Sequence, residues 1–418
     1  MNEWRALNEF VRKHHGQVEL GCYKKFMSKK IKNLAKLKPA TKLSHVGREY
    51  AEHGMVNPGV YHASTFLFPD VATLNDRHHL EYSYGRFGTP TSRALETAIA
   101  TLEGGHMCKV TPSGMSAIST ALLAFLKSGD HLLMVDTVYW PTRSLIDTML
   151  TKLGIETTFY DPLIGKGIAA LVRPNTRVIY LESPGSQTME VQDVPAIVAV
   201  AHAHGAVAII DNTWTGGHYF KAFEHGCDVS VQAVTKYIAG HSDVMMGSVV
   251  CNEAAWPQFK AAYETLGLFA GPDDMNMALR GLRTLDVRLE RHQKNALVVA
   301  DWLRGQSAVD TVLYPALSNA PGHEMWKRDF KGASGLFSVI LKPVAEEKVA
   351  KMLDGLELFG MGFSWGGFES LVVPFKPHRT ATNWTAEGPC LRFHIGLESP
   401  DDLIADLEQG FKRLLNIS

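Results

Sequence analysis

The stretch Ser230–Gly247 reads SVQAVTKYIAGHSDVMMG and decides the fold prediction. A partly apolar run leads into Thr235 and Lys236, and an aromatic residue and a glycine-containing turn follow. This pattern predicts that Lys236 lies just beyond the end of a buried strand. An ammonium group in a partly apolar crevice loses hydration, so its pKa falls and the free amine becomes a nucleophile that can condense with an aldehyde. Most lysines are solvated surface charges, however, so Lys236 needs a second observation.

Asp211 supplies that observation, because it follows the apolar run 206–210 and precedes Lys236 by 25 residues. Neighbouring strands of a parallel sheet would bring this carboxylate and the amine to one edge of the sheet, where open α/β sheets bind ligands. A Schiff-base Lys and an Asp against a pyridinium nitrogen are the groups with which proteins hold pyridoxal phosphate (PLP). Either residue alone has an ordinary explanation, since a strand-end Asp also caps the loop that follows it.

Length and composition limit the class of protein. The chain has 418 residues, of which 45% are hydrophobic and 20% charged, and its formal net charge is −1. This length allows two or three domains with a large core. No apolar run is long enough for a transmembrane helix, and the near-neutral charge gives no general attraction for nucleic acid or anionic lipid. We therefore expect a globular protein that binds neither nucleic acid nor membranes.

The cysteines and histidines indicate neither disulfides nor a metal site. No CxxC pair occurs, and the five cysteines are scattered: Cys22, Cys108, Cys227, Cys251 and Cys390. This pattern favours reduced thiols and a cytoplasmic location. HExxH is absent, and histidine pairs such as His78 and His79 lack the Cys or carboxylate neighbours of a zinc site.

The N-terminal segment is strongly basic. Residues 1–42 contain eleven Lys or Arg and three Glu, which gives this segment a net charge of +8. It lacks the apolar core of a secretory signal, and its acidic residues and scarcity of Ser disfavour an organelle transit peptide. We expect residues 1–40 to form a mobile basic arm, and Met27 is a candidate for the true start of the protein.

Apolar strands and amphipathic helices alternate through the middle of the chain. Strands are predicted at His131–Val135, Val178–Leu181, Val207–Ile210, Val229–Gln232 and Gly247–Cys251. Helices are predicted at Ser92–Glu103, from about Gly114 to Leu126, at Thr142–Leu153 and at Pro195–His204. This alternation predicts an α/β fold with a doubly wound, mostly parallel sheet. Helical spacing from Met275 to about Gln306 then leads to a smaller α+β C-terminal domain.

Two glycine-containing segments could bind an anion. In YSYGRFGTP, Tyr84 and Arg86 could hold a phosphate through a hydroxyl and a forked contact, although a turn with an exposed Arg is the simpler explanation. In TPSGMSA, Gly114 and Met115 begin a helix, and free amides at a helix start receive anions. A Ser-Gly pair before a helix is commonplace, so this second signal gains weight only from a cofactor that carries a phosphate.

Two further residues are candidates for contacts with a ligand. Tyr139 follows the strand that ends at Val135, and its ring could lie on a flat cofactor or simply fill the core, which is the default. Arg392 stands in the otherwise apolar run LRFHIGL. Burying an Arg is costly unless it meets an anion, which could be a ligand carboxylate or a structural Glu.

Six motifs together resemble the Cys/Met-metabolism family of PLP enzymes. They are YGRFGTPT, SGMSAI, LESPGSQTMEVQDVP, DNTW, TKYIAGHSDVMMG and LRFHIGLE, and the likeness runs from about Thr41 to the C-terminus. SWGGFES is similar to the bacterial cystathionine β-lyase branch of that family. Trp365 is the discriminating position, because γ-cleaving relatives tend to carry a small aliphatic residue there. Ala233 departs from the family pattern, in which many members have a Ser that touches the phosphate.

The resemblance implies a role for each candidate residue. Lys236 would bind the cofactor aldehyde and act with Tyr139 in catalysis, Asp211 would pair with the pyridine nitrogen, and the Tyr139 ring would stack on the cofactor. The phosphate would be held by Gly114, Met115 and Thr235 of one subunit and by Tyr84 and Arg86 of its neighbour. Arg392 would bind the substrate carboxylate, with Ser364 and Trp365 lining the pocket.

The resemblance also implies a domain plan, an assembly and an activity. After the basic arm it gives a segment at 41–85 that contacts a neighbouring subunit, a large PLP domain at 86–272, and a linker helix with a small domain at 273–418. Sites would be shared within a dimer, and a tetramer is usual in the family. The expected reaction is carbon–sulfur β-elimination of the amino-acid thioether cystathionine. Alternatives are a β-lyase for cysteine, cystine or another S-conjugate, and a PLP-binding regulatory protein without turnover.

Overall fold

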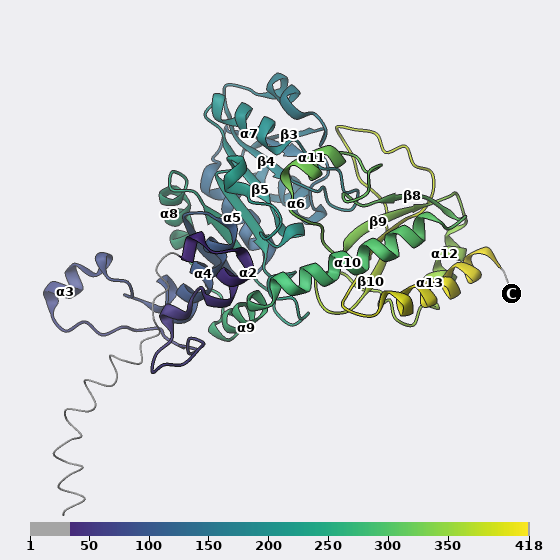
Figure 1. Cartoon of the computed structure of the whole chain (residues 1–418). Helices are drawn as coiled ribbons and strands as arrows, with labels where there is room; N and C mark the ends of the chain where they lie inside the picture. Colours follow the sequence, from purple (N-terminus) through teal and green to yellow (C-terminus); the bar gives the residue numbers. More distant parts are fainter. Residues whose placement is uncertain (1–33, 417–418) are drawn as a thin grey trace, which may run out of the picture.

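A seven-stranded sheet forms the centre of the larger domain (Figure 1). The computed structural model describes residues 34–416, so most of the predicted basic arm, with Met27, lies outside the described residues. In order across the sheet, the strands are β1 (Met107–Thr111), β7 (Gly247–Cys251), β6 (Val229–Ala233), β5 (Val207–Asp211), β4 (Thr176–Glu182), β2 (His131–Val135) and β3 (Glu156–Tyr160). The pairs from β6 to β3 are parallel and the two pairs of β7 are antiparallel. The predicted mostly parallel sheet is therefore confirmed.

The strands of this sheet are largely apolar, which explains why helices cover both of its faces. Every residue of β2 and of β7 is buried, as expected of strands with helices over both faces. The helices of the larger domain are α4 (Pro90–Glu103), α5 (Gly114–Phe125), α6 (Trp140–Leu145), α7 (Val194–Ala203), α8 (Trp256–Leu266) and α9 (Pro272–Arg283). A π-helical turn, Ile146–Leu150, follows α6.

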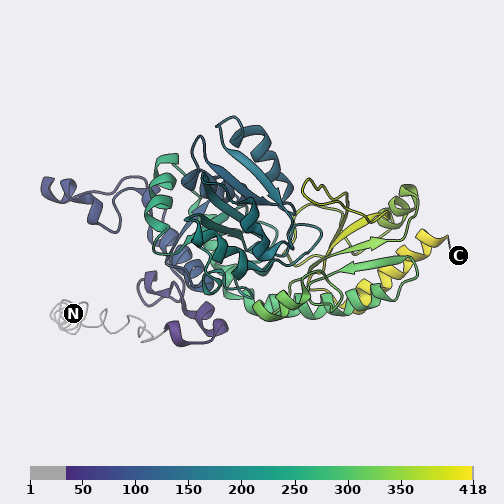
Figure 2. The same ribbon diagram turned by 90° about the horizontal axis from the view of Figure 1, so that it is seen from above.

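The helical spacing predicted from Met275 to about Gln306 corresponds to two helices, α9 and α10 (Leu285–Arg304). They are separated at Thr284, whose hydroxyl donates to the Gly281 carbonyl at 3.2 Å. Gly281 also lets α9 approach the segment that follows Lys236, because a Cβ there would lie 2.1 Å from the Ala239 carbonyl oxygen. Helix α10 then runs from the larger domain along the smaller one (Figures 1 and 2).

The smaller domain is built on a four-stranded antiparallel sheet. Its order is β10 (Leu371–Phe375), β11 (Cys390–His394), β9 (Leu336–Leu341) and β8 (Val309–Leu313). Three more helices belong to this half of the chain: α11 (His323–Asp329), α12 (Glu346–Asp354) and α13 (Pro400–Leu415). The predicted smaller α+β domain is confirmed, whereas the exact boundaries given above for the chain's parts stay predictions.

The segment before α4 contains α2 (Pro39–His45) and α3 (Val71–Asn75), and α3 projects away from both domains (Figures 1 and 2). Apolar side chains are exposed on this projection: Leu67 is 93% exposed and Val71 is 71% exposed. Such side chains are normally buried, so this segment has the surface expected of a contact with another chain.

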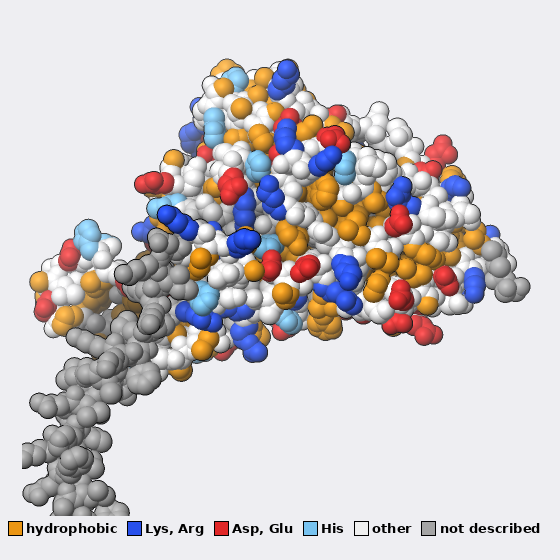
Figure 3. All heavy atoms as spheres, in the orientation of Figure 1, with side chains coloured by type: hydrophobic (Ala, Val, Ile, Leu, Met, Phe, Trp, Pro, Cys, Tyr) orange, Lys and Arg blue, Asp and Glu red, His pale blue; other side chains and the backbone are white. Residues whose placement is uncertain are grey.

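Charges of both signs are interspersed on the face seen in Figure 3. Within residues 34–416, no helix is long and apolar enough to cross a membrane. The cysteines in that range are buried and free: Cys108, Cys227, Cys251 and Cys390.

Candidate functional site

A cavity of about 750 Å³ lies where the C-terminal ends of β4, β5 and β6 meet the smaller domain. It brings together side chains that are far apart in the sequence. Of the residues predicted from the sequence, the following line it: Gly114, Met115, Tyr139, Asp211, Thr235, Lys236, Ser364, Trp365 and Arg392.

Lys236 occupies the first turn after β6, and its amine points across the cavity toward the smaller domain. Nζ donates to Ser364 Oγ at 2.7 Å and lies 5.3 Å from the centre of the Trp365 ring. Burial lowers the pKa of Lys236 to about 8, with the Arg392 charge acting in the same direction and Asp211 opposing. A much larger fraction of this amine than of an ordinary lysine is therefore unprotonated near neutral pH, as a nucleophile or base requires.

The turn that carries Ser364 and Trp365 fits closely against the lysine backbone. Ser364 has a φ of +82°, an uncommon conformation for a residue with a side chain. Gly366 follows with a φ of +88°, and a Cβ there would lie 2.9 Å from the carbonyl carbon of Lys236. The Gly366 amide also donates to His394 Nε2 at 3.0 Å. The SWGG sequence thus permits a strained turn that delivers Ser364 to the amine.

Two carboxyl groups stand side by side on the larger-domain edge, since Glu182 at the end of β4 is in register with Asp211 at the end of β5. Asp211 Oδ1 accepts from the Thr213 amide at 3.0 Å and from its hydroxyl at 2.5 Å. Burial raises the pKa of Asp211, opposed by these bonds and by Lys236. Burial and the Asp211 charge raise the pKa of Glu182 well above its ordinary value. The Thr213 bonds and the Lys236 charge therefore favour a negative charge on Asp211 over one on Glu182.

Tyr139 is placed by this second carboxyl group. Its amide donates to Glu182 Oε2 at 2.8 Å, while the residue itself remains 43% exposed. Burial of part of the phenol, together with Glu182 and Asp211, raises the pKa of Tyr139, and the Arg392 charge opposes that rise. The ring is therefore available to the cavity and close enough to Arg392 to feel its charge.

The start of α5 offers free amides to the cavity. Ser113 and Ser116 form a reciprocal cap in which each side chain accepts from the other's amide. Within residues 34–416, this leaves the amides of Gly114 and Met115 without a partner. Gly114 is needed here, since a Cβ would lie 2.8 Å from the Cβ of Ala233. An anion can be bound at such a helix start.

Thr235 and Ala233 contribute differently to this end of the cavity. The Thr235 hydroxyl donates to the Met246 carbonyl at 3.1 Å and accepts from the Met246 amide at 2.9 Å. Its donor would therefore have to leave that carbonyl to reach a phosphate. Ala233, where many relatives carry a Ser, has no hydroxyl, and its amide donates to Thr213 Oγ1 at 2.9 Å.

Arg392 lies in β11 on the smaller-domain edge. Its Nη2 donates to the Ser364 carbonyl at 3.0 Å, and its Nε is buried without a partner. No Asp or Glu among the described residues forms an ion pair with it. The sequence left two anions open as partners of Arg392. No Glu within residues 34–416 takes that place, so the guanidinium remains available for a ligand carboxylate.

Tyr84 and Arg86 are the predicted site residues that do not line this cavity. Arg86 Nη1 donates to the Glu264 carbonyl at 2.8 Å and its guanidinium lies over the Phe87 ring. Tyr84 is 44% exposed. Their assignment to a neighbouring subunit's site stays a prediction.

Glu182 is an ionisable cavity residue that the sequence analysis does not predict. A signal is present, because Glu182 directly follows the predicted strand Val178–Leu181, just as Asp211 follows its own predicted strand. The motif LESPGSQTMEVQDVP contributes to the family resemblance, but nothing in it indicates that its first carboxyl group lies beside Asp211.

The chain matches the model of one protein family, Cys/Met metabolism PLP-dependent enzyme, over residues 40–412. Cystathionine β-lyase of Escherichia coli strain K12 is 45% identical over 396 residues, which cover 91% of this chain and 100% of that protein. L-alanine/L-glutamate racemase of Wolbachia pipientis wMel is 40% identical over 396 residues, which cover 90% of this chain and 98% of that protein.

A solved structure has the same fold. Cystathionine γ-synthase from Xanthomonas oryzae pv. oryzae, in complex with cystathionine, has a TM-score of 0.83 at 32% identity, with 91% of this chain and 100% of that chain covered. The match of the family model over most of the chain, together with these relatives, means that the chain belongs to the family of Cys/Met metabolism PLP-dependent enzymes.

Proposed function

We propose that this enzyme is a cystathionine β-lyase, which converts L-cystathionine and water to homocysteine, pyruvate and ammonia. The observation that carries the proposal is the meeting of Lys236, Asp211 and Arg392 in one cavity, with Arg392 free of any acidic partner in the described chain. The similarity to a relative named cystathionine β-lyase supports the choice of substrate.

The residues of the cavity fit PLP. A phosphate would bind at the free amides of Gly114 and Met115, and Asp211 Oδ2, which has no hydrogen-bond partner within residues 34–416, would pair with the pyridine nitrogen. Lys236 would bind the aldehyde. When bound, PLP withdraws electrons from the α-carbon of an attached amino acid, which makes loss of the α-proton and of a β-substituent possible.

Lys236 is proposed to move the proton. Its lowered pKa of about 8 suits an amine that removes the α-proton and then donates a proton to the departing sulfur. Ser364 Oγ, which accepts from Nζ at 2.7 Å, would hold the amine over the cavity between these two tasks. The ionised Asp211 would keep a positive charge on the ring nitrogen, so removing that charge should impair proton loss.

Arg392 is proposed to bind the substrate α-carboxylate. Arg392 is half-buried and its Nε is buried without a partner, and a forked contact would fix the orientation of the amino acid. Trp365 packs 5.4 Å from the Tyr237 ring and bounds the cavity beside Lys236, which leaves less room there than an aliphatic side chain would.

Product analysis tests the activity. The purified holoenzyme is incubated with L-cystathionine, L-cysteine, L-cystine and L-alanine, and keto acids, thiols and D-alanine are measured. We expect pyruvate with an equal amount of homocysteine, and cystathionine as the preferred substrate. Formation of 2-oxobutyrate with cysteine would instead indicate γ-cleavage. D-alanine without pyruvate would indicate a racemase, and no product at all a binding protein.

We also propose that the working unit is at least a dimer with shared sites. Tyr84 and Arg86 lie outside their own chain's cavity, and they follow the projecting segment whose apolar side chains are exposed. A second copy of the chain would cover that segment and receive these two residues at the phosphate end of its cavity. Assembly as a tetramer would add a second such pair.

Mixing two inactive variants tests the shared site. In a refolded mixture of Arg86→Ala and Lys236→Ala chains, one site of each mixed dimer has both residues intact. We expect recovery of roughly a quarter of the wild-type activity, because half of the dimers formed at random are mixed and have one complete site each. Sedimentation of the wild type as a monomer, or no recovery in a mixture that contains mixed dimers, would contradict the shared site.

We place the enzyme in the cytoplasm, as the thiols suggest. Cys108, Cys227, Cys251 and Cys390 are all buried and free, which is typical of a reducing compartment.

A further inference from the structure

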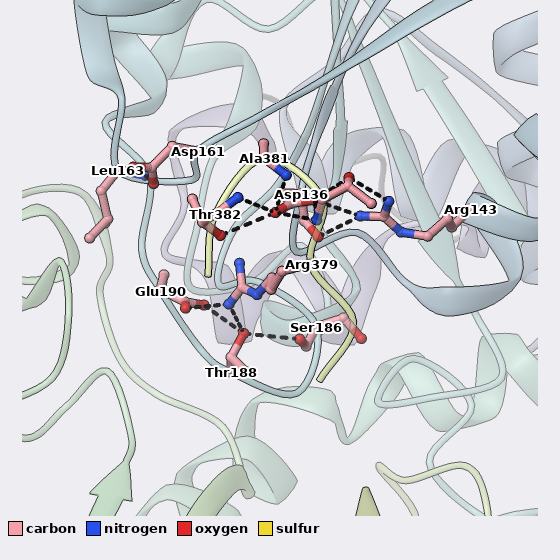
Figure 4. A network of polar contacts seen from close by, with 11 residues as sticks. Asp136, Arg143, Asp161, Leu163, Ser186, Thr188, Glu190, Arg379, Ala381 and Thr382 are labelled. Carbon is pink, nitrogen blue, oxygen red and sulfur yellow. Dashed lines mark hydrogen bonds and ion pairs between the residues drawn. The ribbon is translucent and has the colours of Figure 1, made fainter. Parts of the chain in front are cut away.

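The loop between β10 and β11 is bound to the larger domain by partly buried polar contacts that the proposed chemistry does not use (Figure 4). We propose that they form an interdomain latch, which sets the position of Arg392 against Tyr139 and so determines how tightly the substrate carboxylate is held. The latch consists of Asp136, Arg143, Glu190, Arg379, Thr380 and Thr382. The inference rests on the proposed function, because it requires Arg392 to bind that carboxylate.

Asp136 is the centre of the latch. Its side chain is 0% exposed and pairs with Arg143 Nη2 at 2.8 Å. Its carboxylate accepts from the amides of Thr380 at 2.9 Å and of Ala381 and Thr382 at 3.0 Å. It also accepts from the Thr380 hydroxyl at 3.0 Å and the Thr382 hydroxyl at 3.1 Å. Burial alone would raise the pKa of Asp136, but these bonds and Arg143 outweigh it and lower the pKa.

Arg379 makes the second attachment of the same loop. Its Nη2 donates to Glu190 Oε1 at 2.5 Å and to Thr188 Oγ1 at 2.7 Å. The Arg379 side chain is 6% exposed and that of Glu190 is 12% exposed, so the pair is shielded from water. Glu190 directly follows Met189, which lines the cavity together with residues 184–187. The latch therefore joins the loop to the larger domain at two places. One is Asp136, three residues before Tyr139, and the other is Glu190, beside the cavity wall.

The loop that carries the latch leads into the strand of Arg392. In the β10–β11 pair, Val373 is opposite Arg392, and Phe375 is opposite Cys390 at the end where the loop begins. Arg392 is thus two residues from the start of its strand and ten residues after Thr382, the nearest residue of the latch. On the other side, Asp136 precedes Tyr139 by three residues. Loosening the loop would allow Arg392 to shift relative to Tyr139.

Other contacts keep the domains together when the latch is broken. Trp214 Nε1 donates to the Leu336 carbonyl at 3.0 Å, and the Gly335 amide donates to the Tyr237 hydroxyl at 2.9 Å. These bonds join the two domains away from the loop. A latch variant is therefore expected to retain its fold and its cofactor while the loop moves.

Three substitutions grade the damage to the latch. Asp136→Asn removes the central charge and turns one oxygen acceptor into a donor that faces other donors. Thr380→Val removes the hydroxyl that donates to Asp136 and accepts from Arg143 at 3.1 Å, whereas Thr380→Ser keeps that hydroxyl. The serine variant is therefore the matched control, and the Thr380 pair decides the question if Asp136→Asn does not fold.

Each holoenzyme is titrated with L-alanine, which has a carboxylate, and with ethylamine, which lacks one, and binding is followed by the visible absorbance of the cofactor. We expect alanine to bind about 10-fold more weakly to Asp136→Asn than to the wild type. The loss of alanine affinity should be smaller in Thr380→Val and absent in Thr380→Ser. Ethylamine binding should stay within about 2-fold in every variant. Trypsin should also cleave after Arg379 faster in Asp136→Asn than in the wild type, because the freed loop becomes accessible.

The outcomes separate the latch from the proposed function. If the wild type binds alanine no better than ethylamine, Arg392 does not hold the carboxylate and that part of the proposed function fails. If the wild type prefers alanine and the preference is unchanged in both Asp136→Asn and Thr380→Val, the latch proposal is overturned. Equal weakening of both ligands would overturn it too, since that result indicates general damage to the structure.

Discussion

On the larger-domain edge of the cavity, Asp211 ends β5 and Lys236 follows the neighbouring parallel strand β6. On the smaller-domain edge, Ser364 lies in a strained turn and Arg392 in an antiparallel strand. The first edge is fixed by the hydrogen bonding of a buried sheet. The second depends on side-chain contacts, such as the bond from Lys236 Nζ to Ser364 Oγ. We infer that proton transfer belongs to the rigid edge and substrate recognition to the edge that can adjust.

The largest effect is expected from Lys236→Ala, which removes the proposed base and acid. The rate of cystathionine cleavage should fall by about 10³-fold or more, even at saturating substrate. Lys221→Met is the matched control, because burial also lowers the pKa of Lys221 to about 8 but its amine donates to the carbonyl oxygens of Leu102 and Gly217 outside the cavity. A near-normal kcat in Lys236→Ala would show that Lys236 does not transfer the proton.

The two carboxyl groups of the larger-domain edge should differ in their effect. Asp211→Asn removes the charge that would hold the ring nitrogen positive, and we expect kcat to fall by about 10²-fold or more. Glu182→Gln should change kcat by only a few-fold, since the raised pKa of Glu182 favours its uncharged form, and Gln can still accept from the Tyr139 amide. Steady-state kinetics of both variants measure the two losses in kcat. Equal losses would contradict the assignment of the charge to Asp211.

Arg392→Ala sharpens the contrast, because it affects the smaller-domain edge alone. We expect kcat/KM for cystathionine to fall by roughly 100-fold, mostly through KM, since the carboxylate loses its forked contact. Arg291→Ala removes a guanidinium whose bond, to the Glu398 carbonyl, is exposed, and it should leave both constants unchanged. An unchanged kcat/KM in Arg392→Ala would place substrate recognition elsewhere.

The smallest expected effect is a shift in the pH dependence of chemical labelling at Lys236 in the cofactor-free protein. Only an unprotonated amine reacts with acetic anhydride, so a pKa of about 8 predicts that labelling of Lys236 rises up to about pH 9 and then levels off. Labelling of Lys376 should keep rising, because its bond to Glu346 raises the pKa of that exposed lysine. Quantitative mass spectrometry of both sites would contradict the lowered pKa if their profiles coincided.

The larger-domain edge could be predicted from the sequence because its signals are local. An apolar run followed by Asp211, and another followed by Thr235 and Lys236, are sufficient to place these groups at strand ends, and parallel strands bring such ends together. The predicted strands lie within or next to the observed β2, β4, β5, β6 and β7. The antiparallel β1 was not predicted, since its sequence MCKVT has a Lys in the centre.

Of the smaller-domain edge, only Arg392 could be singled out from its local sequence, as a charge in an apolar run. Nothing local in the sequence indicates that Ser364 adopts a positive φ or that its hydroxyl meets Lys236, which is 128 residues away. The contacts of Asp136 with the loop at Thr380 are also long-range, 244 residues apart. Such contacts depend on how two domains pack, so only resemblance to a family pointed to Ser364 and Trp365, and no signal pointed to Asp136.

The division of work between the two edges can be measured directly with L-alanine in deuterium oxide, because alanine has an α-proton but no group that can leave from its β-carbon. Exchange of that proton is followed by NMR for the wild type, Lys236→Ala and Arg392→Ala, each with bound cofactor. We predict rapid exchange in the wild type, no detectable exchange in Lys236→Ala at any alanine concentration, and recovery of exchange in Arg392→Ala at high alanine. Exchange at the wild-type rate in Lys236→Ala would contradict the account.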